Sequence, residues 1–166
     1  LSDGRFQPTP RGVTRAHSVL AGLDAHEEHV SEGDWALVHD AARPCLTVDA
    51  LAALIDRARA LGEGVILAEP VADTLKQVND RGEIEKTVDR SILWRAQTPQ
   101  LFPLLPLRDA LRHCIDQGVS VTDEAMAMER AGRPVHVVEG ASSNIKVTVE
   151  ADLIFADLFL REAGER

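Results

Sequence analysis

The sequence contains few cysteines, few lysines and no long apolar runs. Its two cysteines, Cys45 and Cys114, have no CxxC spacing, which argues against a disulfide framework or a zinc cluster. No apolar run approaches the roughly 20 residues that span a bilayer, and no basic segment leads into an apolar stretch as in a signal peptide. These absences predict a cytoplasmic protein without a membrane anchor, in which both thiols are small buried fillers.

Positive charge is also scarce. The 166 residues include 18 Lys and Arg against 27 Asp and Glu, which gives a formal net charge of −9. This balance argues against a general nucleic-acid binder, because affinity for a polyanion rests on clustered positive charge. Only Lys76, Lys86 and Lys146 are lysines, so any anionic substrate must be held by a few local cations.

The order of apolar and capped segments predicts one α/β domain over residues 1–166. Short apolar runs favour strands at 35–38, 64–68, 135–138 and 144–147. Helices are expected from Ser18, over 48–61 behind Thr47, over 106–117, behind a Thr122 cap, and over 149–162. Strands that alternate with helices are typical of a doubly wound, mainly parallel sheet.

Ligands of such sheets bind beyond the carboxyl ends of the strands. The residues expected there are Asp40 to Pro44, Pro70 to Thr74, Lys146 and Thr148. An acid, an arginine and a lysine at one edge suit a phosphorylated or hydroxylated ligand. The alternative is a turn stabilised by an Asp40–Arg43 ion pair without any function.

Segments along nearly the whole chain resemble, in the same order, the motifs of the 2-C-methyl-D-erythritol 4-phosphate cytidylyltransferases. They are TRAHSV (14–19), VHDAARP (38–44), PVADTLK (70–76), TVDR (87–90), LW (93–94), QTPQLF (97–102), TDEA (122–125) and VEG to NIKVT (138–148). The resemblance implies a Rossmann-like nucleotidyltransferase fold with a protruding β-arm.

It also implies a reaction in which CTP and methylerythritol phosphate give CDP-methylerythritol and pyrophosphate, in isoprenoid precursor biosynthesis. Mg²⁺ would be bound mainly through the CTP phosphates, and no metal ligands are expected from the protein. Because such a reaction has no covalent enzyme intermediate, the protein has to position two anions and neutralise growing negative charge.

The resemblance assigns three sets of site residues. Lys146 and Arg90 would be catalytic. The sugar-phosphate contacts would be Asp40, Arg43, Thr74, Arg90, Thr98 and Thr122. The nucleotide contacts would be Gly12, Ser18, Ala41 and Lys146.

Two of these residues also have a simpler interpretation. Ser18, expected to meet the cytosine edge, is alternatively a helix N-cap. Lys146, expected to reach the α-phosphate or the cytidine, is alternatively a solvated strand lysine.

The polar segment 71–91 resembles the family's β-arm, with hairpin chemistry at Asn79-Asp80-Arg81-Gly82. The resemblance implies a C2 homodimer in which the arm interlocks with the partner and Arg90 acts in the partner's site. A flexible surface loop is the alternative.

The match is incomplete at the N-terminus. No Gly-rich phosphate-binding loop precedes Arg11-Gly12-Val13, so the domain is expected to lack its first strand and that loop. Two other functions therefore stay open: a related ribitol 5-phosphate cytidylyltransferase, and a non-catalytic dimerisation module with a degenerate nucleotide site. The HEEH segment at 26–29 lacks the spacing of a zinc protease and is not expected to bind metal.

Overall fold

The structure is a computed structural model that describes residues 8–25 and 30–164. These ranges form the helices α1 Arg15–Asp24, α2 Val48–Leu61, α3 Leu104–Asp116, α4 Glu124–Arg130 and α5 Glu150–Gly164. The strands are β1 Trp35–Val38, β2 Gly64–Pro70, β3 Leu75–Val78, β4 Ile84–Val88, β5 Trp94–Pro103 and β6 Val135–Glu139. The HEEH segment lies outside the described residues.

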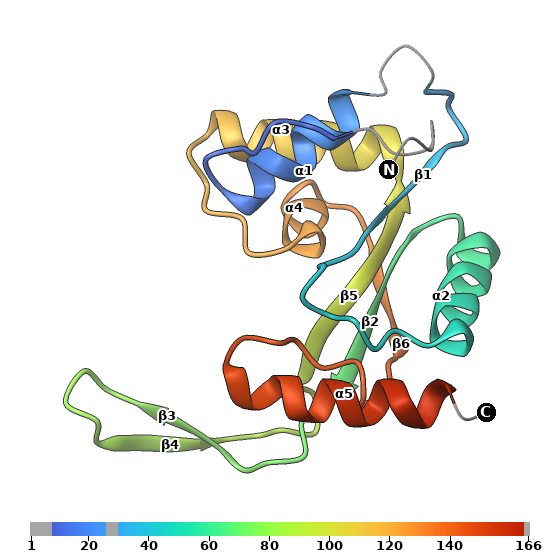
Figure 1. The fold of residues 1–166 in the computed structure, drawn as a ribbon. Helices are drawn as coiled ribbons and strands as arrows, with labels where there is room; N and C mark the ends of the chain where they lie inside the picture. Colours follow the sequence, from blue (N-terminus) through green and yellow to red (C-terminus); the bar gives the residue numbers. More distant parts are fainter. Residues whose placement is uncertain (1–7, 26–29, 165–166) are drawn as a thin grey trace. The chain divides into compact units, whose positions relative to one another are not determined.

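The strands form a central sheet and a separate hairpin. The central sheet has the order β1-β5-β2-β6, and its mainly parallel α/β character confirms the predicted fold class. Strand β5 is an exception, since it pairs antiparallel with β1, from Trp35 opposite Pro103 to Val38 opposite Gln100. Strands β3 and β4 pair antiparallel with each other and form the hairpin drawn in green in Figure 1.

The chain forms two compact units. Unit 1 comprises Leu1–Val38, Ile55–Val65 and Gln100–His136, and unit 2 comprises His39–Leu54, Ile66–Pro99 and Val137–Arg166. In unit 1, α3 packs against α1, α4 and β1. The buried side chains of unit 1 include Leu23, Phe102, Leu107, Leu111, Cys114 and Met128, and those of unit 2 include Cys45, Leu54, Ile66, Leu67 and Ala156.

Several predicted elements are confirmed because their signals are local. Helix α2 begins behind Thr47, whose hydroxyl accepts from the Ala50 N–H, and ends before Gly62, whose φ is +68°. The expected hairpin turn contains Gly82 with φ +78°. Both cysteines are free and buried, as expected of small apolar fillers.

Other predictions are wrong in detail. The first helix begins at Arg15 rather than Ser18, because Thr14 is its N-cap and accepts from the His17 N–H. Helix α4 is capped by Asp123, which accepts from the Met126 N–H, and not by Thr122. The expected strand at 144–147 is a loop.

The predicted last helix is present as α5, and within the described residues Ala156 is buried while several of its large apolar side chains are exposed. The N–H groups of Thr148 and Val149 donate to the Asp152 carboxylate, which starts the helix and lowers the pKa of that carboxyl. Ile154 is 73% exposed, and Leu153, Phe155 and Leu158 are exposed as well. None of the helices in the described ranges has the length and hydropathy to cross a bilayer.

One glycine in unit 1 is required by close packing. A Cβ at Gly64 would overlap the ring of Phe102, which is fully buried. We expect Gly64→Ala to lower the free energy of unfolding by about 1–3 kcal/mol through overpacking. Gly22→Ala is the matched control: nothing lies within 4 Å of its added Cβ, so alanine in α1 should stabilise by about 0.5–1 kcal/mol. Urea denaturation measures both, and equal effects of the two substitutions would contradict the packing argument.

Candidate active site

The predicted acid and the predicted lysine of unit 2 contact each other. Asp40 follows β1, and its carboxylate accepts a hydrogen bond from Nζ of Lys146 at 2.8 Å. The backbone N–H of Asp40 donates to the Thr98 hydroxyl at 3.0 Å, and Thr98 is only 5% exposed. The Lys146 side chain is 45% exposed. Thr98 thus holds the backbone of Asp40, and Asp40 in turn orients a solvent-accessible ammonium group.

Arg43 is anchored by main-chain oxygens. Its Nη1 donates to the Asn144 carbonyl at 2.7 Å and its Nη2 to the Ala96 carbonyl at 3.3 Å, while its buried Nε has no hydrogen-bond partner. Burial lowers the pKa of the guanidinium, Asp40 opposes this shift and Arg95 adds to it. A turn forms here, since the Arg43 N–H donates to the Asp40 carbonyl, and the Asp40 carboxylate pairs with Lys146. Arg43 is therefore held rigidly beside the Asp40–Lys146 pair.

A buried amide network explains why 144–147 is a loop. Nδ2 of Asn144, a residue that is 1% exposed, donates to the Gln97 side chain at 3.1 Å and to the Thr98 carbonyl at 2.9 Å. Gln97 donates onward to the Ala141 carbonyl. The backbone N–H of Asn144 also donates to the Ala141 carbonyl. Side-chain and turn hydrogen bonds therefore take the place of the hydrogen bonds to a neighbouring strand. This network fixes the loop that carries Lys146.

Of these residues, Arg43, Gln97, Asn144 and Lys146 line a polar cavity of about 350 Å³ within unit 2, whereas Asp40 and Thr98 do not. Its cationic lining residues are Arg43, Arg95 and Lys146, and its acidic one is Glu69. The remaining lining residues are Ala96, Gln97, Ser142, Asn144, Ile145 and Thr148. An excess of positive charge with hydroxyl and amide groups suits a phosphorylated, hydroxylated ligand.

The other predicted site residues of unit 2 do not line this cavity. Ala41 is exposed in the turn after Asp40. Thr74 and Arg90 are exposed at the two ends of the β3–β4 hairpin, and the Arg90 guanidinium donates to the Ala72 carbonyl.

The predicted nucleotide-binding residues of unit 1 meet at the start of α1. The Ser18 hydroxyl accepts from the Gly12 N–H at 3.0 Å and donates to the Thr14 carbonyl at 3.2 Å. Ser18 is therefore not an N-cap, which corrects that alternative. A Cβ on Gly12 would overlap the backbone of His17 and Ser18, so the close approach requires glycine.

An ion pair that joins α1 to α4 in unit 1 is not predicted by the sequence. Arg15 donates from both Nη atoms to Glu124, at 2.6 and 2.9 Å, and Glu124 is fully buried. Next to it, Gln100 donates to Asp123 and accepts from the Ala125 N–H. Thr122 lies just before this group and is exposed. The spacing of these residues along the chain gives no signal that they meet.

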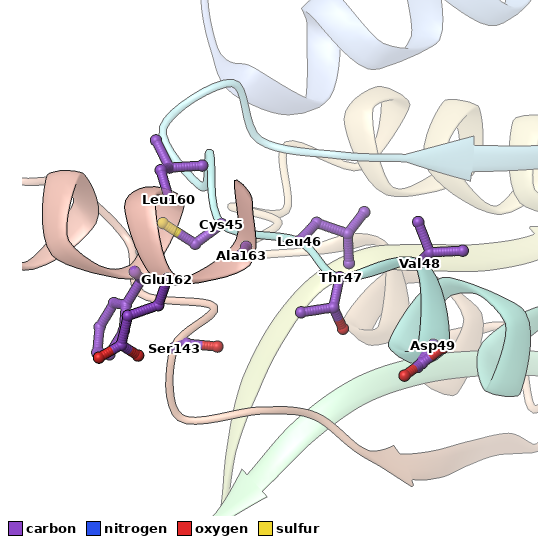
Figure 2. A pocket seen from close by; sticks show the side chains of 10 residues that line it. Cys45, Leu46, Thr47, Val48, Asp49, Ser143, Leu160, Glu162 and Ala163 are labelled. Atoms are coloured by element: carbon purple, nitrogen blue, oxygen red, sulfur yellow. The ribbon is translucent and has the colours of Figure 1, made fainter. Parts of the chain in front are cut away.

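A second cavity of unit 2, of about 520 Å³, is unsuited to a phosphate. Figure 2 shows side chains from the segment 45–49 and from α5 around it. Apart from Asp49 and Glu162, its lining residues are uncharged: Cys45, Leu46, Thr47, Val48, Ser143, Phe159, Leu160 and Ala163. Burial raises the pKa of the Cys45 thiol, so this group is not an activated nucleophile. Two carboxylates without a cation repel an anionic substrate.

The described residues do not form a metal site of their own. Within 8–25 and 30–164, no three His, Cys, Asp or Glu side chains gather as ligands. The Asp40 carboxylate is paired with Lys146, and the Glu69 carboxylate with Arg95.

A comparison with protein-family models shows the family to which the chain belongs. Residues 9–162 match the family model described as "IspD: 2-C-methyl-D-erythritol 4-phosphate cytidylyltransferase". The chain belongs to this family. The resemblance of its motifs is thereby confirmed.

Individual IspD relatives agree in sequence and in structure. The 2-C-methyl-D-erythritol 4-phosphate cytidylyltransferase of Aeromonas hydrophila is 50% identical over 165 residues, which are 99% of this chain and 65% of the relative. That of Acinetobacter baumannii strain SDF is 48% identical over 150 residues, which are 90% of this chain and 63% of the relative. The crystal structure of the Francisella tularensis enzyme has a TM-score of 0.88 and 35% identity, and the match covers 96% of this chain and 74% of that one. The chain thus spans somewhat less than two thirds of the length of the two curated relatives.

Proposed function

We propose that the protein transfers a cytidylyl group from CTP to 2-C-methyl-D-erythritol 4-phosphate in isoprenoid precursor biosynthesis. A phosphate oxygen of the sugar-alcohol phosphate attacks the α-phosphorus of CTP. The bond from that phosphorus to the bridging oxygen breaks, and pyrophosphate leaves with its electron pair. The observation that carries this proposal is Lys146, which pairs with Asp40 and lines a cavity with two further cations in a chain of the IspD family.

Each site residue has a role that suits the chemistry of its side chain. Lys146 stabilises the negative charge that grows on the α-phosphate oxygens, and its flexible stem lets the ammonium follow that charge. Asp40 accepts hydrogen bonds from sugar-alcohol hydroxyls, and Arg43 and Thr98 hold it in place. Ser18 binds the cytosine edge, while Gly12 and Ala41 leave room for the nucleotide. Thr122 and Thr74 add hydroxyl contacts to the sugar phosphate.

Mg²⁺ accompanies CTP in this proposal. Because the described residues offer no metal site, the ion is assigned to the CTP phosphates, where it offsets their charge.

A substrate panel tests the function. The protein expressed from its complete gene is given CTP and Mg²⁺ with methylerythritol phosphate or ribitol 5-phosphate, and pyrophosphate release is followed. We expect release with methylerythritol phosphate. Release with ribitol 5-phosphate alone, or with neither acceptor, would overturn the proposal in favour of the related enzyme or the non-catalytic module.

We also propose that the β3–β4 hairpin joins two copies of the chain and brings Arg90 into the partner's site. The hairpin supports this because nearly all of its residues are exposed, Val78 and Ile84 among them. Figure 1 shows it projecting beyond the other elements of unit 2. A two-stranded ribbon of this kind needs a partner surface for stability.

Mixed dimers test the placement of Arg90. Arg90→Ala and Lys146→Ala proteins should each be nearly inactive, since each loses a cation from every site. After subunit exchange at equal concentrations, a site made of Lys146 from one chain and Arg90 from the other is intact. The mixture should therefore regain about a quarter of the wild-type turnover, as random pairing of two subunits gives. A mixture as inactive as its parents would place Arg90 in the site of its own chain.

A further inference from the structure

One cation of the unit 2 cavity has no role in the function proposed above. Arg95 lies on β5 and lines the cavity together with Arg43 and Lys146. Its side chain is 62% exposed, so the guanidinium is open to a ligand. None of the family motifs found in the sequence includes Arg95, which lies between the LW and QTPQLF segments.

Glu69 fixes the position of Arg95. Its Oε2 accepts from Nη2 of Arg95 at 2.7 Å, and its Oε1 accepts from the Ser142 hydroxyl at 2.7 Å. The carboxylate, 17% exposed, joins β2 and β5 to the loop that carries Lys146. A guanidinium has five N–H donors, so Arg95 has donors for a second anion while it stays paired with Glu69.

The electrostatics of the cavity favour such an anion. Three cations line it against a single carboxylate, that of Glu69. Arg43 and Arg95 line the same cavity, and the positive charge of Arg95 adds to the effect of burial in lowering the pKa of the Arg43 guanidinium. A phosphate bound between Arg43 and Arg95 offsets their positive charges and gains charge-assisted hydrogen bonds.

The size and lining of the cavity indicate which anion it takes. Its volume of about 350 Å³ is near the lower end of ligand pockets, and no aromatic side chain lines it to stack on a base. Ser142 and Thr148 offer hydroxyl groups at its edge. These features favour a phosphorylated polyol over a nucleoside triphosphate.

We infer that Arg95 binds the phosphate group of the sugar-alcohol phosphate and that Glu69 is the positioning residue that holds the guanidinium there. The identity of the substrate rests on the proposed function; the contact of Arg95 with a phosphomonoester does not. Arg95 thereby contributes to the choice between phosphorylated and unphosphorylated acceptors.

Steady-state kinetics of the full-length protein test the contact. Arg95→Gln should raise the KM for methylerythritol phosphate by about tenfold or more, as loss of a charge-assisted hydrogen bond does, with kcat and the KM for CTP changed by less than about twofold. Arg161→Gln is the matched control, because Arg161 is also an exposed arginine paired with a carboxylate, at 2.8 Å from Asp157. It should behave as wild type. An unchanged KM for methylerythritol phosphate in Arg95→Gln, or a raised KM for CTP in its place, would overturn the inference.

The role of Glu69 is tested by non-additivity. Glu69→Gln alone should raise the same KM, but by less than Arg95→Gln, since the guanidinium loses only its orientation. In the Arg95→Gln background, Glu69→Gln should have no further effect on that KM. A further increase in the double variant would show that Glu69 acts through the loop and not through Arg95.

A binding measurement separates this inference from the proposed function. Inorganic phosphate is titrated into the full-length protein while the amide resonances of Ile145 and Thr148 are followed. We expect these resonances to shift in wild type, with a dissociation constant about tenfold weaker in Arg95→Gln. If the protein transfers no cytidylyl group, the proposed function fails, and the phosphate titration still decides the role of Arg95. Equal phosphate affinity in both proteins would refute it.

Discussion

Lys146→Ala should lower kcat by about 10²–10³-fold, the range seen when one group that stabilises transition-state charge is removed. The ammonium lies 2.8 Å from Asp40 in a cavity that holds two further cations. Since the Lys146 side chain is 45% exposed, the free energy of unfolding should change by less than about 1 kcal/mol. Pyrophosphate release and urea denaturation of the same preparation measure the two effects.

Two further variants control the effect of Lys146. Lys146→Arg keeps the charge but replaces a compact ammonium with a planar fork, so its kcat should fall between those of wild type and Lys146→Ala. Arg59→Ala removes an exposed positive charge in the last turn of α2 and should leave kcat unchanged. A kcat of Lys146→Ala close to that of wild type would show that Lys146 has no catalytic role.

Arg15→Ala should lower the free energy of unfolding by about 3 kcal/mol, because it leaves the Glu124 carboxylate buried without its Arg15 partner. Glu124 is fully buried and receives both Nη atoms of Arg15. Arg112→Ala is the matched control in the same unit, since Arg112 pairs with Asp24 at 2.8 Å but both side chains are well exposed. That exposed pair should contribute less than about 1 kcal/mol.

Urea denaturation of the full-length protein measures both substitutions. The double variant Arg15→Met, Glu124→Leu removes both charges and should regain much of the lost stability, as replacement of a buried ion pair by apolar side chains often does. A loss in Arg15→Ala no greater than that in Arg112→Ala would contradict the assignment of a buried pair.

Local signals account for what the sequence predicted of the fold. Helix α2 was predictable because a threonine cap, a glycine stop and an apolar periodicity agree over one segment. The 144–147 segment looked like a strand by the same local criteria. Asn144 nevertheless fixes its backbone as a loop, because the buried Asn144 side chain forms hydrogen bonds with Gln97 and Thr98, more than forty residues earlier in the chain. Such long-range partners leave no periodic signal in the sequence.

The candidate site likewise contains residues that the sequence predicted and contacts that it did not. Residues of matched motifs, such as Asp40 and Lys146, were predicted from resemblance, and the structure brings these two together. Their catalytic roles stay predictions. The pairs Arg95–Glu69 and Arg15–Glu124 join residues 26 and 109 positions apart, which neither spacing nor the motifs connect.

The product formed by the full-length protein tests the proposed cytidylyl transfer directly. CTP, Mg²⁺ and methylerythritol phosphate are incubated with wild type and with Lys146→Ala, and phosphorus NMR follows the diphosphate resonances. We expect CDP-methylerythritol and pyrophosphate to appear in equal amounts with wild type, and far more slowly with Lys146→Ala. Pyrophosphate without the cytidine diphosphate product, or the same rate in both proteins, would contradict it.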